Sequence, residues 1–177
     1  MVKIETSRLL LRTMDGGDIP TLMEGMNNPN IVRFLVGVQQ PFTRQDAINW
    51  IYECSKQSED FSFLGIELLS EGRLIGEIGL SPIIPQKKFG ALAYWLLPQN
   101  QGNGYASEAL KSFTEYSFND LGLDELEASF FLDNNSSRKL VERLGFRLDA
   151  RYDKGIRPCE VTGKPEEVYV LRNPQIR

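Results

Sequence analysis

The chain has 177 residues, of which 41% are hydrophobic and 25% charged, and these values predict one well-packed domain over residues 1–177. A net charge of −4 provides no overall basic field, so we do not expect a nucleic-acid-binding protein. The longest apolar run, at 91–97, is too short to span a membrane and the opening residues lack a signal-peptide pattern, so a cytoplasmic protein with no membrane partner is expected.

The first half of the chain predicts a strand, two helices and three further strands. Consecutive leucines indicate a buried strand at 8–14, and a helix is expected to start at Asp18. Thr43 stands three residues before Asp46 in a variant of the capping box, which predicts a second helix over 42–56. Turn-rich connectors separate three strand-like runs that we expect to pair as antiparallel neighbours, at 61–69, 73–81 and 89–97.

The second half alternates helices and strands. Apolar residues at helical spacing predict an amphipathic helix that starts near Ala106 and ends near Gly122. A strand at 125–132, a short helix at 134–146 and last strands at 146–152 and 166–172 are expected to follow. This order of elements predicts a mixed α/β fold with one central sheet.

A polar, glycine-punctuated loop, PQNQGNGYASEA, lies at 98–109 between a predicted strand and the amphipathic helix. Gly102 and Gly104 allow a tight turn that presents several unpaired amides at the helix start, where the helix dipole attracts anions. The loop has no Lys or Arg, which argues against a P-loop, and it lacks the third glycine of a dinucleotide fingerprint. The residues alone leave two alternatives open: a phosphate or pyrophosphate site, and a plain turn before a helix.

Three segments carry a resemblance to one enzyme family. Residues Gln99 to Gly104 match the Q/R-x-x-G-x-G/A pyrophosphate motif of the GNAT acetyltransferases, and the continuation YASEAL resembles their subgroup that acetylates the N-terminal alanine or serine of ribosomal proteins. NNSSRKLVERLGF, at 134–146, resembles a second segment of that subgroup, and the opening IETSRLLLR resembles the family's first strand. The resemblance implies a mixed, mainly antiparallel sheet of about seven strands with helices on both faces.

The resemblance also implies acetyl-CoA as co-substrate and the residues that hold it. The strand before the loop is expected to splay from its neighbour, so that the pantetheine arm pairs with its backbone, and the pyrophosphate is expected on the loop amides. Asn134 is expected to reach the pantetheine amides and also to cap a helix. The implied cofactor-binding residues are Trp95, Leu96, Leu97, Gln101, Gly102, Asn103, Gly104, Tyr105, Ala106 and Asn134. No metal is expected, because the chain has no His and its two cysteines are isolated.

Acetyl transfer needs a proton donor for the thiolate and an acceptor for the ammonium proton. Ser137 is the candidate donor, since many relatives carry a tyrosine where this chain has Val141; helix capping is its alternative role. Glu77 is the leading base, because a glutamate among apolar strand residues is unusual; a solvated outward side chain is the alternative. Further acidic candidates are Asp149, Asp153 and Glu160.

Three other side chains receive structural interpretations. Glu108 is expected to be structural, because the helix dipole favours an acid in the first turn. Tyr94 and Trp95 either line the acceptor site or, more commonly for aromatic strand residues, belong to the core.

These features predict transfer of an acetyl group from acetyl-CoA to a primary amine by direct attack. The leading acceptor is the N-terminal α-amine of a protein such as a ribosomal protein. A polyamine, an amino sugar or an antibiotic is an alternative acceptor, and a CoA-binding regulatory module without turnover is an alternative function. The expected partners are acetyl-CoA and the amine acceptor, and the chain is expected to be a monomer or a homodimer.

Overall fold

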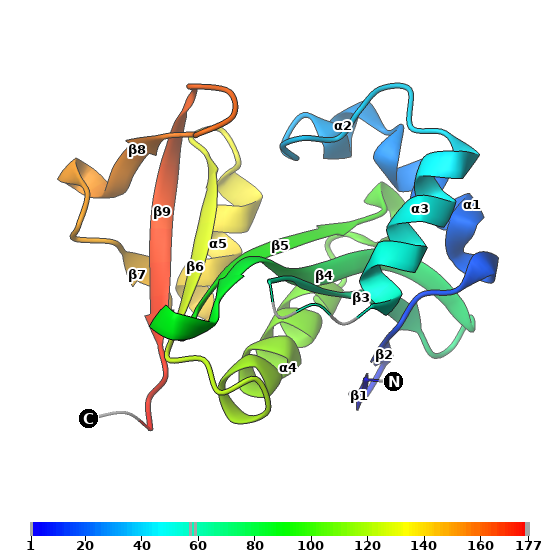
Figure 1. Cartoon of the computed structure of the whole chain (residues 1–177), viewed down its shortest axis with the longest axis horizontal. Helices are drawn as coiled ribbons and strands as arrows, with labels where there is room; N and C mark the ends of the chain where they lie inside the picture. Colours follow the sequence, from blue (N-terminus) through cyan, green and yellow to red (C-terminus); the bar gives the residue numbers. More distant parts are fainter. Residues whose placement is uncertain (1, 57, 59, 176–177) are drawn as a thin grey trace.

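The structure, a computed structural model, describes residues 2–56, 58 and 60–175. A nine-stranded sheet forms its centre, with the order β1-β2-β3-β4-β5-β6-β9-β7 and with β8 paired to β9 (Figure 1). Its strands are β1 (Lys3–Glu5), β2 (Leu9–Arg12), β3 (Ser62–Leu68), β4 (Arg73–Ile84), β5 (Phe89–Leu96), β6 (Glu125–Phe131), β7 (Arg147–Leu148), β8 (Ile156–Pro158) and β9 (Pro165–Arg172). Its helices are α1 (Ile19–Met26), α2 (Pro29–Val32), α3 (Arg44–Ser55), α4 (Tyr105–Asn119) and α5 (Asn135–Arg143).

The predicted fold class is confirmed, with a correction to the number of strands. Among the described strands every pair is antiparallel except β5 and β6, which are parallel. The sheet has nine strands where about seven were expected. The two additional strands, β1 and β8, have three residues each, which is too short for a periodic hydrophobic pattern.

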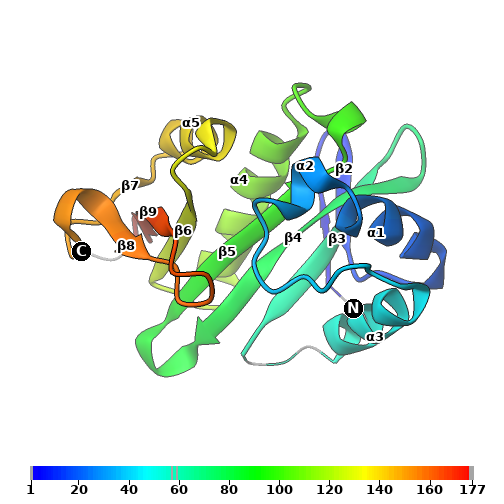
Figure 2. The same cartoon turned by 90° about the horizontal axis from the view of Figure 1, so that it is seen from above.

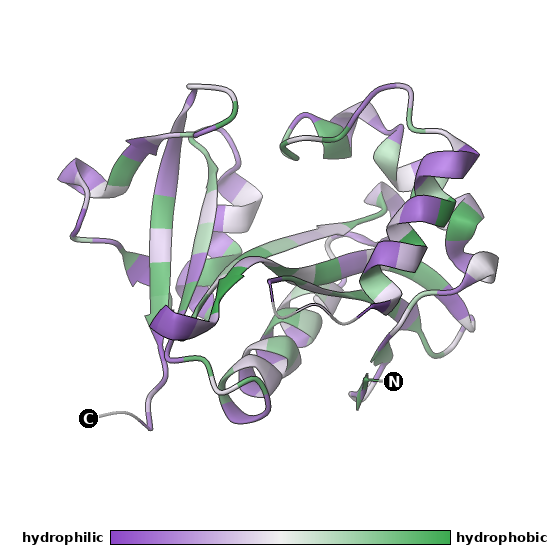
Figure 3. Cartoon of the chain, in the orientation of Figure 1, coloured by the Kyte–Doolittle hydropathy of each residue, from purple (hydrophilic) through white to green (hydrophobic). Residues whose placement is uncertain are grey.

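Helices cover both faces of the sheet, each over its own hydrophobic core. On one face α4 and α5 contribute residues such as Phe113 and Val141 to a core shared with the strands. On the other face α1, α2 and α3 enclose a second core that includes Leu22 and Trp95. Figure 2 shows these three helices gathered on the β3 and β4 side, whereas α5 lies beside β6. Figure 3 shows hydrophobic and hydrophilic positions alternating in patches along α4, as expected for a helix with one buried side.

The parallel pair in the middle of the sheet separates part of the way along. Pairing runs from Phe89 opposite Glu125 to Leu92 opposite Ala128 and stops there. β5 continues to Leu96 and β6 to Phe131, and the two ribbons diverge in Figure 1. The sheet therefore contains a gap between the C-terminal halves of β5 and β6, whose N-terminal halves are paired.

None of the helices in the described ranges is both long enough and apolar enough to cross a membrane.

Candidate active site

The glycine loop forms a cradle of free amides at the start of α4. Gly102 and Gly104 have φ angles of +79° and +82°, a conformation that L-residues with a side chain rarely adopt. Over the described residues, no hydrogen-bond acceptor is found for the backbone amides from Gly102 to Ala106. A Cβ built on Gly102 would have no atom within 4 Å, so the space above the loop is open. Unpaired amides at a helix N-terminus are suited to an anionic group.

A cation from the other end of the chain stands beside this cradle. The guanidinium of Arg8 donates to the carbonyl of Asn103 at 3.0 Å and lies 4.6 Å from the ring centroid of Tyr105. Glu108, in the first turn of α4, accepts hydrogen bonds from the Nε of Arg8 at 2.7 Å and its backbone amide at 2.9 Å. The hydroxyls of Thr6 and Ser7 donate to the same carboxylate at 2.6 and 2.9 Å. The segment before β2 is thus tied to the glycine loop.

The gap between β5 and β6 is lined by main-chain groups of β5 that do not pair with β4. The amide of Leu97 donates to the carbonyl of Ile75 on β4 at 2.9 Å. Because bonded residues alternate along an antiparallel ladder, Trp95 and Leu97 direct their main-chain groups toward β4, and Tyr94 and Leu96 direct theirs toward the gap. The carbonyl of Leu96 accepts from the Nε2 of Gln101 at 2.9 Å. A slender chain with amide groups can add to β5 as a strand would.

A cleft of about 1620 Å³ joins the gap, the glycine loop and the segment that follows α2. Glu77 lines it from β4 and is only 4% exposed. Its carboxylate accepts hydrogen bonds from the indole nitrogens of Trp50 at 2.5 Å and Trp95 at 3.0 Å. Burial raises the pKa of Glu77 to about 7, although the two indole hydrogen bonds oppose this shift. A carboxylate with a pKa near neutrality is suited to accept a proton.

The other wall of the cleft is formed by α5. Asn134 caps this helix through its side-chain oxygen, which accepts from the amide of Ser137 at 3.3 Å. No acceptor for the side-chain Nδ2 of Asn134 is found among the described residues, so this group is available toward the cleft. Ser137 and Tyr94 both line the cleft here. Tyr94 packs against the core of α4 and α5, opposite to Trp95 and Glu77.

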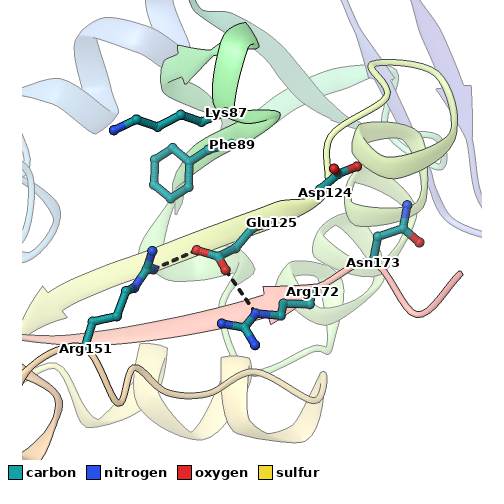
Figure 4. Close-up of a pocket in the computed structure, with 7 residues that line it drawn as sticks. All are labelled: Lys87, Phe89, Asp124, Glu125, Arg151, Arg172 and Asn173. Carbon is teal, nitrogen blue, oxygen red and sulfur yellow. Dashed lines mark hydrogen bonds and ion pairs between the residues drawn. The ribbon is translucent and has the colours of Figure 1, made fainter. Parts of the chain in front are cut away.

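A second, smaller cavity of about 330 Å³ lies where β6 begins and β9 ends. Figure 4 shows Arg151 and Arg172 both directed at Glu125, at 2.7 and 3.1 Å. This cavity contains none of the predicted site residues, and its charges are largely paired with one another. The cleft, with a buried carboxyl and free amides, is therefore the candidate active site. The cavity is lined by Lys87, Phe89, Asp124, Glu125, Arg151, Arg172 and Asn173.

The comparison with family models shows to which protein family the chain belongs. The model described as "Acetyltransferase (GNAT) domain" matches residues 8–147. The chain belongs to the GNAT acetyltransferase family. The uncharacterized N-acetyltransferase YoaA of Bacillus subtilis is 29% identical over 146 residues, which cover 81% of this chain and 82% of YoaA.

Solved structures of acetyltransferases share the fold. A ribosomal L7/L12 alpha-N-protein acetyltransferase in complex with coenzyme A superimposes with a TM-score of 0.84 at 18% identity, covering 97% of this chain and 98% of that one. Spermidine N-acetyltransferase from Vibrio cholerae, in complex with CoA and spermine, gives a TM-score of 0.77 at 21% identity, covering 94% and 96%. The two neighbours act on different amines, so the fold by itself does not choose an acceptor.

The acetyltransferase uses acetyl-CoA as its co-substrate, and its cleft fits that molecule. The free amides and open space at Gly102 suit a pyrophosphate, and the gap beside β5 suits a pantetheine arm. No group of three or more His, Cys, Asp or Glu residues suited to a metal ion occurs in 2–56, 58 and 60–175.

The structure brings most of the predicted site residues to one cleft. Leu97 and Asn103 are not among the residues that line it. Asp149, Asp153 and Glu160 also lie outside it, and Asp149 is buried against Arg151. The predicted residues that line the acetyltransferase cleft are Glu77, Trp95, Leu96, Gln101, Gly102, Gly104, Tyr105, Ala106, Asn134 and Ser137.

Two features of the acetyltransferase site were missed from the sequence. The loop itself has no cation, but Arg8 supplies one from about a hundred residues earlier. No local pattern links Arg8 to the loop, although both lie in segments that resemble the family. The structural interpretation of Glu108 agrees with its contacts, but its main partners are Thr6, Ser7 and Arg8 rather than the helix dipole alone.

Replacing Glu108 by Gln is expected to weaken CoA binding about tenfold, because the loop would lose the anchor that orders it before the cofactor arrives. Burial opposes ionisation of Glu108, but hydrogen bonds from Thr6, Arg8 and Ser7 lower its pKa to about 2, so the wild-type carboxylate is charged at neutral pH. Calorimetric titration with CoA measures the change. Glu115→Gln, on the exposed side of the same helix, is the matched control and should bind CoA normally.

Proposed function

We propose that this acetyltransferase acetylates the N-terminal α-amine of a protein, such as a ribosomal protein. In this proposal Glu77 accepts the ammonium proton, and Ser137 donates a proton to the departing thiolate. The proposed cofactor contacts are the loop amides from Gly102 to Ala106, the β5 backbone around Leu96, and Asn134. The amide of Gln101, which was also expected to hold the pyrophosphate, donates to the carbonyl of Pro98 at 3.2 Å. A cytoplasmic location, one domain over 1–177 and a monomeric or homodimeric state stay predictions.

The balance of charge in the cleft supports an acceptor with a single cationic amine. The lining residues include three acids, Asp46, Glu77 and Glu142, and three bases, Arg33, Lys139 and Arg143. A polyamine carries several cations and would be favoured by an excess of carboxylates, which these lining residues do not provide. An N-terminal residue presents one ammonium group followed by neutral peptide groups. This charge balance is the observation that carries the choice of acceptor.

The size of the cleft and the aromatic side chains beside Glu77 also support a protein N-terminus as the acceptor. Its neighbours Trp50 and Phe63 line the cleft with it, and their rings meet at a centroid distance of 5.1 Å. The cleft, at about 1620 Å³, exceeds the roughly 300–1,000 Å³ of a typical small-molecule site. It has room for an acetylated pantetheine arm and for a short extended peptide.

The proposed proton acceptor and the proposed proton donor lie on opposite faces of the sheet. Glu77 and Trp95 lie with α1 to α3, whereas Ser137 and Tyr94 lie with α5. The amine nitrogen, after losing its proton to Glu77, attacks the thioester carbon from the first side. The carbon–sulfur bond then breaks with its electron pair on sulfur, and Ser137 supplies a proton to the sulfur from the second side. A second proton leaves the nitrogen for water as the bond breaks, so the product is a neutral amide. Holding the amine and the thioester in line within one gap contributes to the rate by positioning.

The acceptor is tested by measuring thiol release from acetyl-CoA with a panel of amines. The panel contains hexapeptides that begin with Ala or Ser, the same peptides with acetylated N-termini, spermidine, and an aminoglycoside. We expect release with the free peptides and none with the acetylated ones. Release with spermidine or the aminoglycoside alone would contradict the proposed acceptor. Thermal stabilisation by CoA without release from any amine would indicate a binding module.

A further inference from the structure

Tyr94 carries a buried hydroxyl that has no hydrogen-bond partner within residues 2–56, 58 and 60–175. Its phenolic oxygen is shielded from solvent, and no donor or acceptor among the described residues meets hydrogen-bond geometry with it. Leaving a buried hydroxyl unpaired is unfavourable, so a phenylalanine would be more stable here if the side chain served only the core. The last residue of β5 that pairs with β6 is Leu92, and Tyr94 lies two residues beyond it, beside the gap.

The hydroxyl of Ser137 is a polar neighbour of this hydroxyl. Burial raises the pKa of Tyr94 to about 12, and the Ser137 hydroxyl is the one group that acts in the opposite direction. The two oxygens are close neighbours without the geometry of a hydrogen bond. Both residues line the cleft, Tyr94 from β5 and Ser137 from the first turn of α5.

We infer that Tyr94 and Ser137 form a relay of two hydroxyls, in which Tyr94 is the source of the proton that Ser137 passes to the departing thiolate. This inference rests on the proposed place of Ser137 beside the sulfur. Tyr94 is then a positioning and proton-supplying residue that acts through Ser137. The relay gives the unpaired hydroxyl a partner during the reaction.

The proton movements balance. When the carbon–sulfur bond breaks, the electron pair stays on sulfur, which takes the proton of the Ser137 hydroxyl. The Ser137 oxygen takes the proton of Tyr94 in the same movement, which leaves a phenolate. Water returns a proton to Tyr94 after the product leaves. A phenol is a far stronger acid than an aliphatic hydroxyl, so the relay provides an acid that Ser137 alone does not.

The relay is tested first without an acceptor amine, by titrating the thiol of bound CoA. Thiolate absorption near 240 nm, followed as a difference spectrum against pH, reports the pKa of that thiol. If the two hydroxyls serve the thiolate, this pKa lies below that of free CoA in the wild-type enzyme and rises by about one pH unit in both Tyr94→Phe and Ser137→Ala. The double variant should match the single variants, because each substitution interrupts the same relay.

Turnover and stability provide the second measurement. With saturating acetyl-CoA and an Ala- or Ser-initiated hexapeptide, Tyr94→Phe should lower kcat about tenfold or more and leave the KM for acetyl-CoA unchanged. Its melting temperature should equal or exceed that of the wild type, because the change removes an unpaired hydroxyl. Tyr116→Phe is the matched control: Tyr116 is half-buried on α4 and does not line the cleft, so both quantities should be normal.

The outcomes distinguish the relay from the proposed acceptor. An unshifted thiol pKa in Tyr94→Phe, additive effects in the double variant, or a destabilised Tyr94→Phe protein would each overturn the relay. A shifted thiol pKa together with no turnover on any peptide would support the relay and contradict the acceptor. Normal peptide turnover in Tyr94→Phe would support the acceptor and overturn the relay.

Discussion

Glu77→Gln is expected to lower kcat by about 10²- to 10³-fold while CoA affinity stays within about twofold. The substitution keeps the size of the side chain but removes the proposed acceptor of the ammonium proton. Glu77 lies on β4, away from the glycine loop, so cofactor binding should be spared. Stopped-assay turnover and calorimetric titration with CoA measure the two quantities on the same preparation.

The pH dependence of turnover gives a sharper test of this role. A base must be ionised to act, so activity is present above its pKa and is lost as the pH falls through it. With the pKa of Glu77 raised to about 7 by burial, the acid limb of the profile is expected near pH 7. Trp50 lowers this pKa by donating a hydrogen bond at 2.5 Å. Trp50→Phe should therefore move the acid limb to higher pH.

Glu160→Gln is the matched control for Glu77. Glu160 was a candidate base in the sequence, but it is exposed and lies outside the cleft. Its substitution should leave both kcat and the pH profile unchanged. If the Glu160 variant shifted the pH profile and the Glu77 variant did not, the base would be Glu160 and the assignment to Glu77 would be wrong. If neither shifted it, the proton would pass directly to solvent.

Gly104→Val is expected to weaken CoA binding about a hundredfold, which corresponds to the loss of one or two amide bonds to a charged oxygen. A β-branched residue is strained at the φ of +82°, so the turn must change and its amides no longer converge. Gly102→Val should act in the same way, because its φ is +79°. Isothermal titration with CoA measures the loss.

The same substitution at Gly72 separates strain from ligand binding. Gly72 also has a positive φ, +61°, and open space around its Cβ position, but it lies in the turn between β3 and β4 and outside the cleft. Gly72→Val should reduce stability and leave CoA affinity unchanged. S-acetylpantetheine, which has no pyrophosphate, should react with the Gly104 variant as it does with the wild type. Equal losses with both donors would contradict the cradle.

The cofactor part of the site could be predicted from local sequence because it depends on neighbouring residues. A strand, two glycines at a fixed spacing and an amphipathic helix follow one another from 89 to 119, so the anion cradle is a local feature. The capping box of Thr43 and Asp46 was predictable for the same reason and is present. The short strands β1 and β8 were not, since they form by pairing with strands elsewhere in the chain.

The proposed catalytic part of the site depends on contacts between distant residues. β4 is buried along most of its length, so no alternation of polar and apolar residues told which face Glu77 takes. Its partners Trp50 and Trp95 come from α3 and β5, and only the folded sheet brings the three together. Likewise, the sequence left Tyr94 open between the acceptor site and the core, and its unpaired hydroxyl is evident only in the folded structure.

Because β5 and β6 separate, a bound cofactor would contact both halves of the sheet and stabilise it. The strands β1 to β5 and β6 to β9 are joined by a ladder of four residue pairs, from Phe89 to Leu92 on the β5 side. A ligand that fills the gap bridges both halves, so its binding free energy adds to the resistance of the chain against unfolding. The melting temperature in the presence of CoA thus reports cofactor binding, even for variants with no turnover. Measured beside turnover on the same preparation, it distinguishes variants that fail to bind CoA from variants that bind CoA but do not transfer the acetyl group.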